Sequence, residues 1–333
     1  MTKAKIGIIG LGGIAQLVHL PILSKLNSVE ISAVSDINKN RLKTISDKFN
    51  IKNFFSDYHE MLEKTDLDAV IISTPTATHT QIAIDCLNAD KDLLIEKPIS
   101  KSLEEAIQID ALALKKKRKV MVGLNARFRP DAMLLKSLVN SGELGNIFYV
   151  RCGWTRKQSS SEKWFIKKSE SGGGVIIDLG IVILDLSMWI LDFPEIHSVS
   201  VQNFYHQTKN VEDSAIGFIR FKNSSVINFE VSWSLHSEVD SLNLIAFGSK
   251  GTVHLNPFRA YRRMNYGNID LTPAHNSNVK GLYKKSYENE LKHFIGAIKN
   301  LNPLYSSSTD AVHRMQLIEG IYKSAETNSE IKF

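Results

Sequence analysis

Short runs of apolar, often β-branched residues alternate with segments of helical period over residues 1–124. Several of these runs are apolar at consecutive positions, as expected of strands that helices cover on both faces. The alternation predicts an α/β domain whose parallel sheet is built from β-α-β units. The predicted strands are Ala4–Ile9, Glu30–Ser35, Ala69–Ser73, Asp92–Ile95 and Val120–Leu124, and the predicted helices include Lys39–Phe49, Thr78–Asn88 and Leu103–Lys117.

The pattern changes after Leu124, where longer strands follow one another with few helices between them. Turn residues join these strands, which favours an α+β second domain with a mostly antiparallel sheet over residues 125–307. A C-terminal helix and tail are predicted over residues 308–333. The predicted strands are Ile147–Thr155, Ile196–Phe204, Ala215–Phe221, Val226–Trp233 and Asn243–Phe247, with helices near Asp131–Asn140 and Glu288–Lys299 and a loop-rich segment over Asn256–Lys285.

The composition is typical of a soluble globular protein, with 43% hydrophobic and 23% charged residues. The sequence has no run of 18 apolar residues, so no membrane-spanning segment is expected. A net charge of +6 without clustered basic and aromatic residues argues against a nucleic-acid partner. Cys86 and Cys152 lack the spacing of a metal or redox pair. We therefore expect a cytoplasmic protein without a metal site.

A glycine-rich loop follows the first predicted strand and opens a helix. Its sequence, Gly10-Leu11-Gly12-Gly13-Ile14-Ala15, fits the pattern G-x-G-x-x-A. Gly10 permits a tight turn, Gly12 lets the backbone approach a pyrophosphate, and the small Ala15 lets the helix pack closely on the strand. Phosphates would lie at the positive end of that helix. The loop therefore predicts a Rossmann-type dinucleotide site.

Asp36 ends the second predicted strand, 21 residues beyond Ala15. A carboxylate at this position accepts hydrogen bonds from the ribose 2′-hydroxyl of NAD and repels the 2′-phosphate of NADP. The alternative is that Asp36 only caps the following helix. Together with the glycine loop, Asp36 predicts NAD rather than NADP as the cofactor, although Lys39 and Arg41 lie near enough to weaken that preference.

Lys97 follows the strand predicted over Asp92–Ile95, within the sequence Glu96-Lys97-Pro98. The carboxyl ends of strands in an open parallel sheet face the ligand crevice, so Lys97 is expected near the nicotinamide. Pro98 restricts the backbone directly after it. The alternative is a solvated Glu-Lys pair at the end of a strand.

These motifs resemble those of the Gfo/Idh/MocA oxidoreductase family, and the resemblance extends from the first strand to the last helix. It rests on the glycine loop, Ser73-Thr74-Pro75 with His79, Glu96-Lys97-Pro98, Arg127-Phe128, Leu144–Ile147, Trp164-Phe165 before Gly172–Gly174, and Ile321–Thr327. It implies an NAD-dependent dehydrogenase or reductase of CH–OH groups, in which Lys97 contacts the substrate hydroxyl and helps to move its proton. The cofactor contacts would include Thr74, Pro75, His79 and Glu96, and the substrate contacts would include Arg127 and Trp164.

The same resemblance implies how the second domain is used. Its large, open, mostly antiparallel sheet would mediate contacts in a homodimer or homotetramer. The final helix would pack back toward the N-terminal domain. The partner implied is a small-molecule carbohydrate substrate, and no membrane is expected.

The segment Val175–Leu191 predicts a helix that is hydrophobic almost all round and therefore buried. Asp178, Val182 and Asp185 fall on one face of this helix. Carboxylates buried on such a face are costly unless they are hydrogen-bonded or face a polar cavity. Asp178 is therefore predicted to be catalytic or to bind substrate, with capping of local backbone amides as the alternative. Asp185 is predicted either to bind substrate or to be a structural acceptor.

The chain matches the family pattern G-G-G-x-x-x-D-x-G-x-H-x-x-D except at the histidine, where it has Val182. In the family this histidine is the usual acid/base on the sugar hydroxyl, and valine transfers no proton. Three alternatives follow. Lys97 acts alone, another residue such as His236 replaces the histidine, or the chain binds NAD without turning over sugars.

Basic residues are frequent between Asn125 and Glu170, with nine Lys or Arg against four acids, and Arg259, Arg262 and Arg263 form a second cluster. Near the crevice such groups would suit an anionic or nucleotide-linked sugar, whereas a solvated loop surface is the plainer interpretation. The leading hypothesis is an NAD-dependent oxidoreductase that transfers hydride between a sugar or sugar derivative and nicotinamide. The alternatives are an NAD-dependent redox-elimination glycosidase and a catalytically silent NAD-binding sensor or partner protein.

Overall fold

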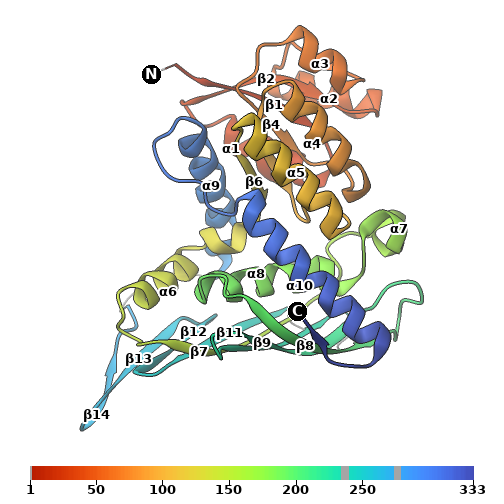
Figure 1. The fold of residues 1–333 in the computed structure, drawn as a ribbon. Helices are drawn as coiled ribbons and strands as arrows, with labels where there is room; N and C mark the ends of the chain where they lie inside the picture. The colour runs from red at the N-terminus through yellow and green to blue at the C-terminus, as the bar shows by residue number, and fades with distance from the viewer. Residues whose placement is uncertain (1, 234–239, 274–278) are drawn as a thin grey trace. The chain divides into compact units, whose positions relative to one another are not determined.

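The structure is a computed structural model that describes residues 2–233, 240–273 and 279–333 (Figure 1). Its contacts divide the chain into two compact units. The first comprises Met1–Asn125 and Tyr287–Val312, and the second comprises Ala126–Ser286 and His313–Phe333.

The sheet of the first unit is parallel and six-stranded, in the order β3-β2-β1-β4-β5-β6. The strand order reverses between β1 and β4, and ligands of such sheets bind at the carboxyl ends of the strands at this point. The predicted Rossmann-type α/β architecture is thus confirmed. The strands are β1 (Ala4–Ile9), β2 (Val29–Ser35), β3 (Phe54–Phe55), β4 (Ala69–Ile72), β5 (Asp92–Glu96) and β6 (Val120–Gly123).

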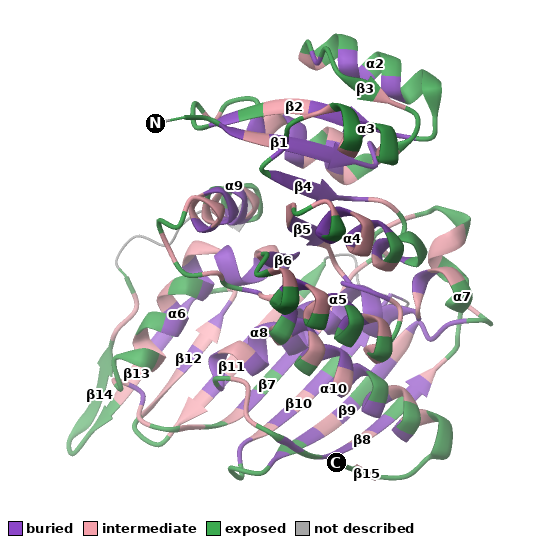
Figure 2. Cartoon of the chain, turned by 45° about the horizontal axis from the view of Figure 1, so that its top comes forward, coloured by how far each residue is buried: buried purple, intermediate pink, exposed green. Residues whose placement is uncertain are grey.

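Two of the longer helices of the first unit begin at side chains that cap them. Asn38 accepts a hydrogen bond from the backbone N–H of Arg41 at the start of α2, and Ser102 accepts one from Glu105 at the start of α5. The central strands β1, β4 and β5 are largely buried (Figure 2). The helical segments are η1 (Ala15–His19), α1 (Leu20–Leu23), α2 (Lys39–Phe49), α3 (Tyr58–Lys64), η2 (Thr76–Thr78), α4 (His79–Asn88) and α5 (Leu103–Lys116).

Residues 287–312 group with the first unit, whereas the sequence pattern placed residues up to 307 with the second domain. The reason lies at the edge strand β6. Ser306 and Val122 exchange backbone and side-chain hydrogen bonds of 2.8 Å, and Lys119 Nζ donates to Asn300 Oδ1 at 2.6 Å. This pairing covers the edge of the parallel sheet, which would otherwise present unpaired backbone groups.

The sheet of the second unit has nine strands in the order β14-β13-β12-β11-β7-β10-β9-β8-β15. All neighbours are antiparallel except β7 and β10, so the predicted α+β class with a mostly antiparallel sheet is confirmed. The strands are β7 (Ile147–Thr155), β8 (Ile196–Phe204), β9 (Ser214–Phe221), β10 (Val226–Ser232), β11 (Ser241–Gly248), β12 (Gly251–Leu255), β13 (Arg259–Met264), β14 (Gly267–Asp270) and β15 (Ile331–Lys332).

The prediction of a loop-rich segment over Asn256–Lys285 was wrong. This part of the chain contains β13, β14 and the first residues of α9 (Val279–Ile298). The two strands lie at the edge of the sheet, and every residue of β14 is exposed. β14 buries neither face and β13 fully buries only Ala260, so the alternation of polar and apolar residues on which the prediction relied is missing there.

The helices α6 and α8 and the C-terminal part of α10 cover one face of the second sheet (Figure 1). The helix over Lys168–Ile190 is long and apolar enough to cross a membrane, but 94% of its most apolar window is buried inside the protein, as in an ordinary core helix. The helical segments are η3 (Asn125–Phe128), α6 (Pro130–Asn140), η4 (Lys163–Ile166), α7 (Lys168–Ser171), η5 (Ile176–Gly180), α8 (Ile181–Ile190) and α10 (Ser308–Thr327).

Candidate cofactor and active site

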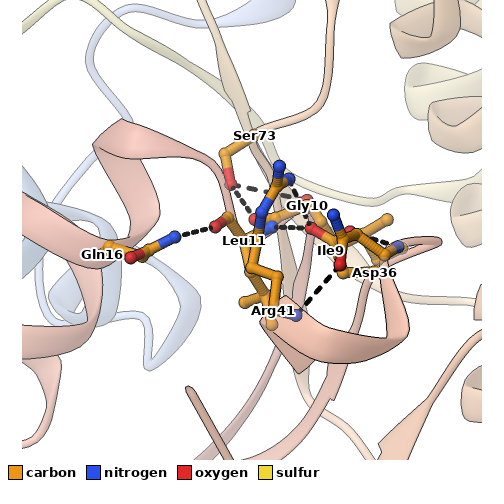
Figure 3. A network of polar contacts seen from close by, with 8 residues as sticks. Ile9, Gly10, Leu11, Gln16, Asp36, Arg41 and Ser73 are labelled. Carbon is orange, nitrogen blue, oxygen red and sulfur yellow. Dashed lines mark hydrogen bonds and ion pairs between the residues drawn. The ribbon is translucent and has the colours of Figure 1, made fainter. Parts of the chain in front are cut away.

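The glycine loop lies at the carboxyl end of β1, beside the loop that follows β4. Gly10 has φ +89°, and a Cβ on it would lie 2.8 Å from the carbonyl carbon and oxygen of Ser73, so no other residue fits. The Ser73 hydroxyl donates to the Gly10 carbonyl at 2.8 Å (Figure 3). A Cβ on Gly12 or Gly13 would meet no atom within 4 Å. The backbone is therefore open at the two positions where a pyrophosphate must approach, and this geometry fits a dinucleotide.

Asp36 is buried next to this loop rather than at the start of a helix. Its Oδ2 accepts a hydrogen bond of 2.7 Å from the backbone N–H of Leu11, and its Oδ1 accepts one of 2.8 Å from Asn38 (Figure 3). Arg41 Nη1 lies 3.2 Å from Asp36 Oδ2. The cap of α2 is Asn38, so the capping alternative does not account for Asp36. Binding of the NAD ribose by this carboxylate stays a prediction.

Lys97 follows directly after β5, and both of its neighbours in the chain are held by buried histidines. His19 Nε2 lies 2.7 Å from Glu96 Oε1. His79 Nδ1 lies 2.8 Å from the carbonyl oxygen of Pro98, and its Nε2 lies 2.8 Å from that of Thr74. The ring of His79 thus lies between the loop of Thr74 and the loop of Pro98, with one nitrogen beside a carbonyl of each. Direct contact between His79 and a cofactor stays a prediction.

Asp178 belongs to the second unit, on the π-helical turn η5. Such turns are rare and are frequently found at functional sites. Its side chain is buried, and its Oδ2 accepts hydrogen bonds of 3.0 Å from the backbone N–H of Ser159 and from Nε1 of Trp233. Neither donor was predicted from the sequence, because Trp233 lies 55 residues away along the chain.

The local backbone amides, which were the alternative partners predicted for Asp178, donate to Glu212 instead. Its Oε1 accepts hydrogen bonds from the N–H groups of Gly174 (2.9 Å) and Ile176 (3.0 Å) and from the Tyr322 hydroxyl (2.9 Å). Burial raises the pKa of Glu212, and these donors oppose the shift. A carboxylate at this place stabilises the positive end of the helix that carries Asp178.

Asp185 and Arg127, both predicted to bind substrate, are joined in a buried ion pair. Arg127 Nε and Nη2 lie 2.7 and 2.6 Å from the two carboxylate oxygens of Asp185, and Arg314 Nη1 lies 2.7 Å from Oδ1. Burial opposes ionisation of Asp185, but the two guanidinium charges outweigh it and hold its pKa below the ordinary value. This geometry favours the structural alternative for Asp185, and substrate binding by either residue stays a prediction.

Val182 is buried in α8, four residues after Asp178, and offers no group that could transfer a proton. The rings of Trp164 and Phe165 meet edge-on with their centroids 5.4 Å apart, and the centroids of the Phe165 and Trp233 rings are 5.8 Å apart. This aromatic cluster packs next to Asp178, because Trp233 is also the residue that donates to its carboxylate. Contact between Trp164 and a substrate stays a prediction. His236 lies outside the described residues. Among the described residues, no group of three or more His, Cys, Asp or Glu side chains could hold a metal ion.

The two cysteines are buried and unoxidised. Burial raises the pKa of each thiol to about 12, so neither is a thiolate near neutral pH. Nucleophilic or redox chemistry of cysteine requires the thiolate, so these residues are packing residues of the core.

The switch-point sheet, the open glycine loop and the buried Asp36 define an NAD-dependent oxidoreductase. The chain belongs to the Gfo/Idh/MocA family. The family model described as "Oxidoreductase family, NAD-binding Rossmann fold" matches residues 4–124, and the "GFO/IDH/MocA C-terminal domain" matches residues 133–254.

Similar proteins align with the chain over nearly its whole length. It is 26% identical to D-glucoside 3-dehydrogenase of Escherichia coli, covering 99% of this chain and 98% of that protein. It is 27% identical to myo-inositol 2-dehydrogenase of Thermotoga maritima, with 98% of each protein covered. Levoglucosan dehydrogenase in complex with NADH and L-sorbose shares the fold, with a TM-score of 0.89 at 20% identity over 100% of this chain and 99% of that one.

Proposed function

We propose that the protein oxidises a secondary hydroxyl group of a sugar or sugar derivative, with Lys97 taking the hydroxyl proton. The observation that supports this proposal most directly is the position of Lys97, which follows directly after β5. Its neighbour Glu96 contacts His19, and its neighbour Pro98 contacts His79. The names of the relatives, a glucoside dehydrogenase and an inositol dehydrogenase, support the same class of substrate.

The backbone of the Gly10–Ala15 loop would hold the pyrophosphate of NAD, and Asp36 would bind its ribose. When bound, NAD supplies the acceptor for the hydride that leaves the substrate carbon. In this oxidation the C–H bond breaks with its electron pair, the O–H bond breaks, and a carbonyl forms. The neutral amine of Lys97 takes the hydroxyl proton. In the reverse direction the ammonium of Lys97 returns it.

Asp178 is proposed to bind the substrate by hydrogen bonding. Support comes from the way its carboxylate is fixed by Trp233 and Ser159. The resemblance to the family implies an acid/base histidine at the position of Val182, and valine transfers no proton, so proton transfer is assigned to Lys97 alone. One general base contributes about 10²–10⁴-fold to a rate, and the loss of a second such group is compatible with turnover.

The basic residues between 125 and 170 largely have acidic partners. Lys136 and Arg127 pair with Asp192 and Asp185. Further pairs join Arg129 to Asp131, Lys167 to Glu170 and Lys168 to Glu326. Paired charges give little net attraction for an anion. We therefore propose a neutral sugar or polyol in preference to a uronate, a sugar phosphate or a sugar nucleotide.

A homodimer or homotetramer is proposed to form through the uncovered face of the second sheet, in the cytoplasm. On that face Ile216 is 50% exposed, and Tyr149 stacks on Phe247 at 5.0 Å on neighbouring strands. Apolar side chains exposed on an open sheet face are typical of a protein interface. Light scattering of wild-type protein should give a mass of two or four chains, and Ile216→Lys should reduce it. A wild-type monomer would refute this part of the proposal.

The substrate proposal is tested by mixing the purified protein and NAD with neutral sugars, polyols, uronates and sugar phosphates, and recording NADH. Net NADH with neutral substrates supports it. Glycoside cleavage without net NADH would favour the redox-elimination glycosidase, and binding of NAD without any turnover would favour the silent protein. Val182→His adds the missing acid/base group and should raise the rate. An unchanged rate would mean that the pocket is adapted to proton transfer without histidine.

A further inference from the structure

We propose that His19 and His79 are positioning residues that couple the two cofactor loops to Lys97, so that occupation of the loops changes the placement of the Lys97 amine. This inference rests on the proposed function only in assigning Lys97 to proton transfer. The coupling itself is a property of the first unit and is measured without any sugar.

His19 connects the glycine loop to Glu96. It ends the π-helical turn η1, which follows the loop directly, and its side chain is 0% exposed. Its Nε2 lies 2.7 Å from Glu96 Oε1, although the two residues are 77 positions apart in the chain. Its Nδ1 has no hydrogen-bond partner among the described residues, so the neutral tautomer with its proton on Nε2 leaves no N–H group unsatisfied. In that tautomer Nε2 is the donor and the Glu96 carboxylate is the acceptor.

The position of Glu96 is fixed on its other side by the neighbouring strand. A Cβ on Gly123 would lie 3.3 Å from the carboxylate carbon of Glu96, so this side chain packs over the bare backbone at the end of β6. The carboxylate is held between His19 and Gly123. A shift of the helix that follows the glycine loop must therefore move Glu96 or break a buried, charge-assisted hydrogen bond.

His79 makes the corresponding connection from the second loop. It begins α4, which follows the Thr74-Pro75 loop after the short helix η2, and it is 1% exposed. Its two ring nitrogens each lie 2.8 Å from a carbonyl oxygen, one on Thr74 and one on Pro98. Burial lowers the pKa of His79, while the two carbonyls and the charges of Glu96 and Glu105 act against that shift. The ring bridges one cofactor loop to the residue after Lys97.

Lys97 thus lies between two residues that are each tied to a different loop. The tie to Glu96 comes from the helix behind the glycine loop, and the tie to Pro98 comes from the helix behind the Thr74 loop. Both ties are buried polar contacts of 2.7–2.8 Å in a packed interior, which transmits displacement because it has few voids. Ligand binding at the two cofactor loops should therefore change the position of the Lys97 side chain. The size of this effect is a coupling free energy between the loops and Lys97.

ADP-ribose distinguishes this coupling from direct shielding of Lys97 by the cofactor. It would occupy the two loops, but it has no nicotinamide that could cover the Lys97 amine. The rate of acetylation of the Lys97 amine by acetic anhydride is measured by mass spectrometry, with and without saturating ADP-ribose. In the full wild-type chain ADP-ribose should change this rate several-fold. In His19→Ala and His79→Ala the effect should be lost, while ADP-ribose still binds. His59→Ala is the matched control, because His59 is an exposed histidine of the same unit, and it should behave as wild type.

The amide of His19→Gln retains a donor toward Glu96 and should restore the coupling, which a purely structural loss would not predict. An unchanged Lys97 rate in wild type on addition of ADP-ribose overturns the proposal, and this arm needs no variant to fold. Retention of the effect in both alanine variants also overturns it. The proposed function fails separately, if Lys97→Met oxidises sugars at the wild-type rate.

Discussion

The indole Nε1–H of Trp233 donates a hydrogen bond of 3.0 Å to Oδ2 of Asp178 and so joins the end of β10 to the π-helical turn η5. The backbone N–H of Ser159 donates to the same oxygen. Two donors on one carboxylate oxygen fix the side chain in a single orientation. The buried Asp178 is thereby oriented from outside its own helix.

Removing this donor should impair turnover more than cofactor binding. Trp233→Phe keeps most of the packing but removes one of the two donors that orient the Asp178 carboxylate, and misplacement of a side chain in an active site can cost about 10²-fold in rate. We expect kcat/KM for the sugar to fall by about tenfold or more, with the Kd for NADH unchanged. Trp154→Phe is the control, because Trp154 stacks on Arg156 instead. Equal losses in both variants would contradict the role given to Trp233.

Asp36 and Arg41 should together set the choice between NAD and NADP. Asp36→Ala removes the proposed ribose ligand and releases Arg41, whose guanidinium lies 3.2 Å from this carboxylate in the wild-type structure. A charge-assisted hydrogen bond to a phosphate is worth about 1.5–3 kcal/mol, so the ratio of NAD to NADP affinity should fall by about tenfold or more. The measurement is the Kd of each reduced cofactor by fluorescence. Arg41→Ala in the same chain should abolish the gain for NADP, and a gain that survives would exclude Arg41 as its cause.

Glu290 should make the protein less stable as the pH rises. Its carboxyl is buried in α9, and burial together with the charge of Glu96 raises its pKa well above the ordinary 4.5. A group with a raised pKa in the folded state stabilises fully below its unfolded pKa and loses that contribution as pH rises toward the folded pKa. Glu290→Gln should therefore be more stable than wild type, by a margin that grows with pH by at most about 1.4 kcal/mol per unit.

Urea unfolding at several values between about pH 5 and about pH 8 measures this margin. The control is Glu288→Gln on the same helix, where the carboxylate pairs with Lys292 at the surface. It should show no such trend. A margin for Glu290→Gln that is constant with pH would mean that this carboxyl is already ionised in the folded protein.

Substitution of Asp185 should lower the free energy of unfolding and should leave the KM for sugar largely unchanged. Asp185→Asn leaves the buried guanidinium groups of Arg127 and Arg314 without a counter-charge, a change that typically costs about 3–5 kcal/mol. Asp192→Asn, which breaks an ion pair with Lys136 at a carboxylate that is 77% exposed, should cost about 1 kcal/mol or less. Thermal or urea unfolding distinguishes the two. A raised KM for sugar with unchanged stability in Asp185→Asn would instead support the substrate-binding prediction.

Much of the first unit could be predicted because its signals are local. The strand over Ala4–Ile9 and the helix over Lys39–Phe49 were predicted with the bounds that the structure has. The tight turn at Gly10 could be predicted because only glycine fits there, and the structure shows that a side chain would clash with Ser73. Asp36 could be predicted as the ribose-binding residue because one β-α-β unit fixes the spacing from the glycine loop to the end of the second strand.

The contacts of the second unit could not be predicted in the same way, because they join residues that are far apart in the chain. The sequence offers no local sign that Glu212 binds the amides of Gly174 and Ile176, or that Trp233 binds Asp178. The hydrophobic helix correctly indicated that Asp185 is buried, but its partners, Arg127 and Arg314, are 58 and 129 positions away. Periodicity reports burial, and it does not report which side chains meet.

The central claim, that this is an NAD-dependent sugar oxidoreductase whose proton-transfer group is Lys97, is tested most directly by one comparison. NADH formation with the best neutral sugar or polyol is followed for wild type, for Lys97→Met and for Lys115→Met, an exposed lysine of the same unit. Loss of a general base should lower kcat of Lys97→Met by about 10²–10⁴-fold, with NADH still bound and Lys115→Met as active as wild type. Wild-type turnover by Lys97→Met would contradict the account.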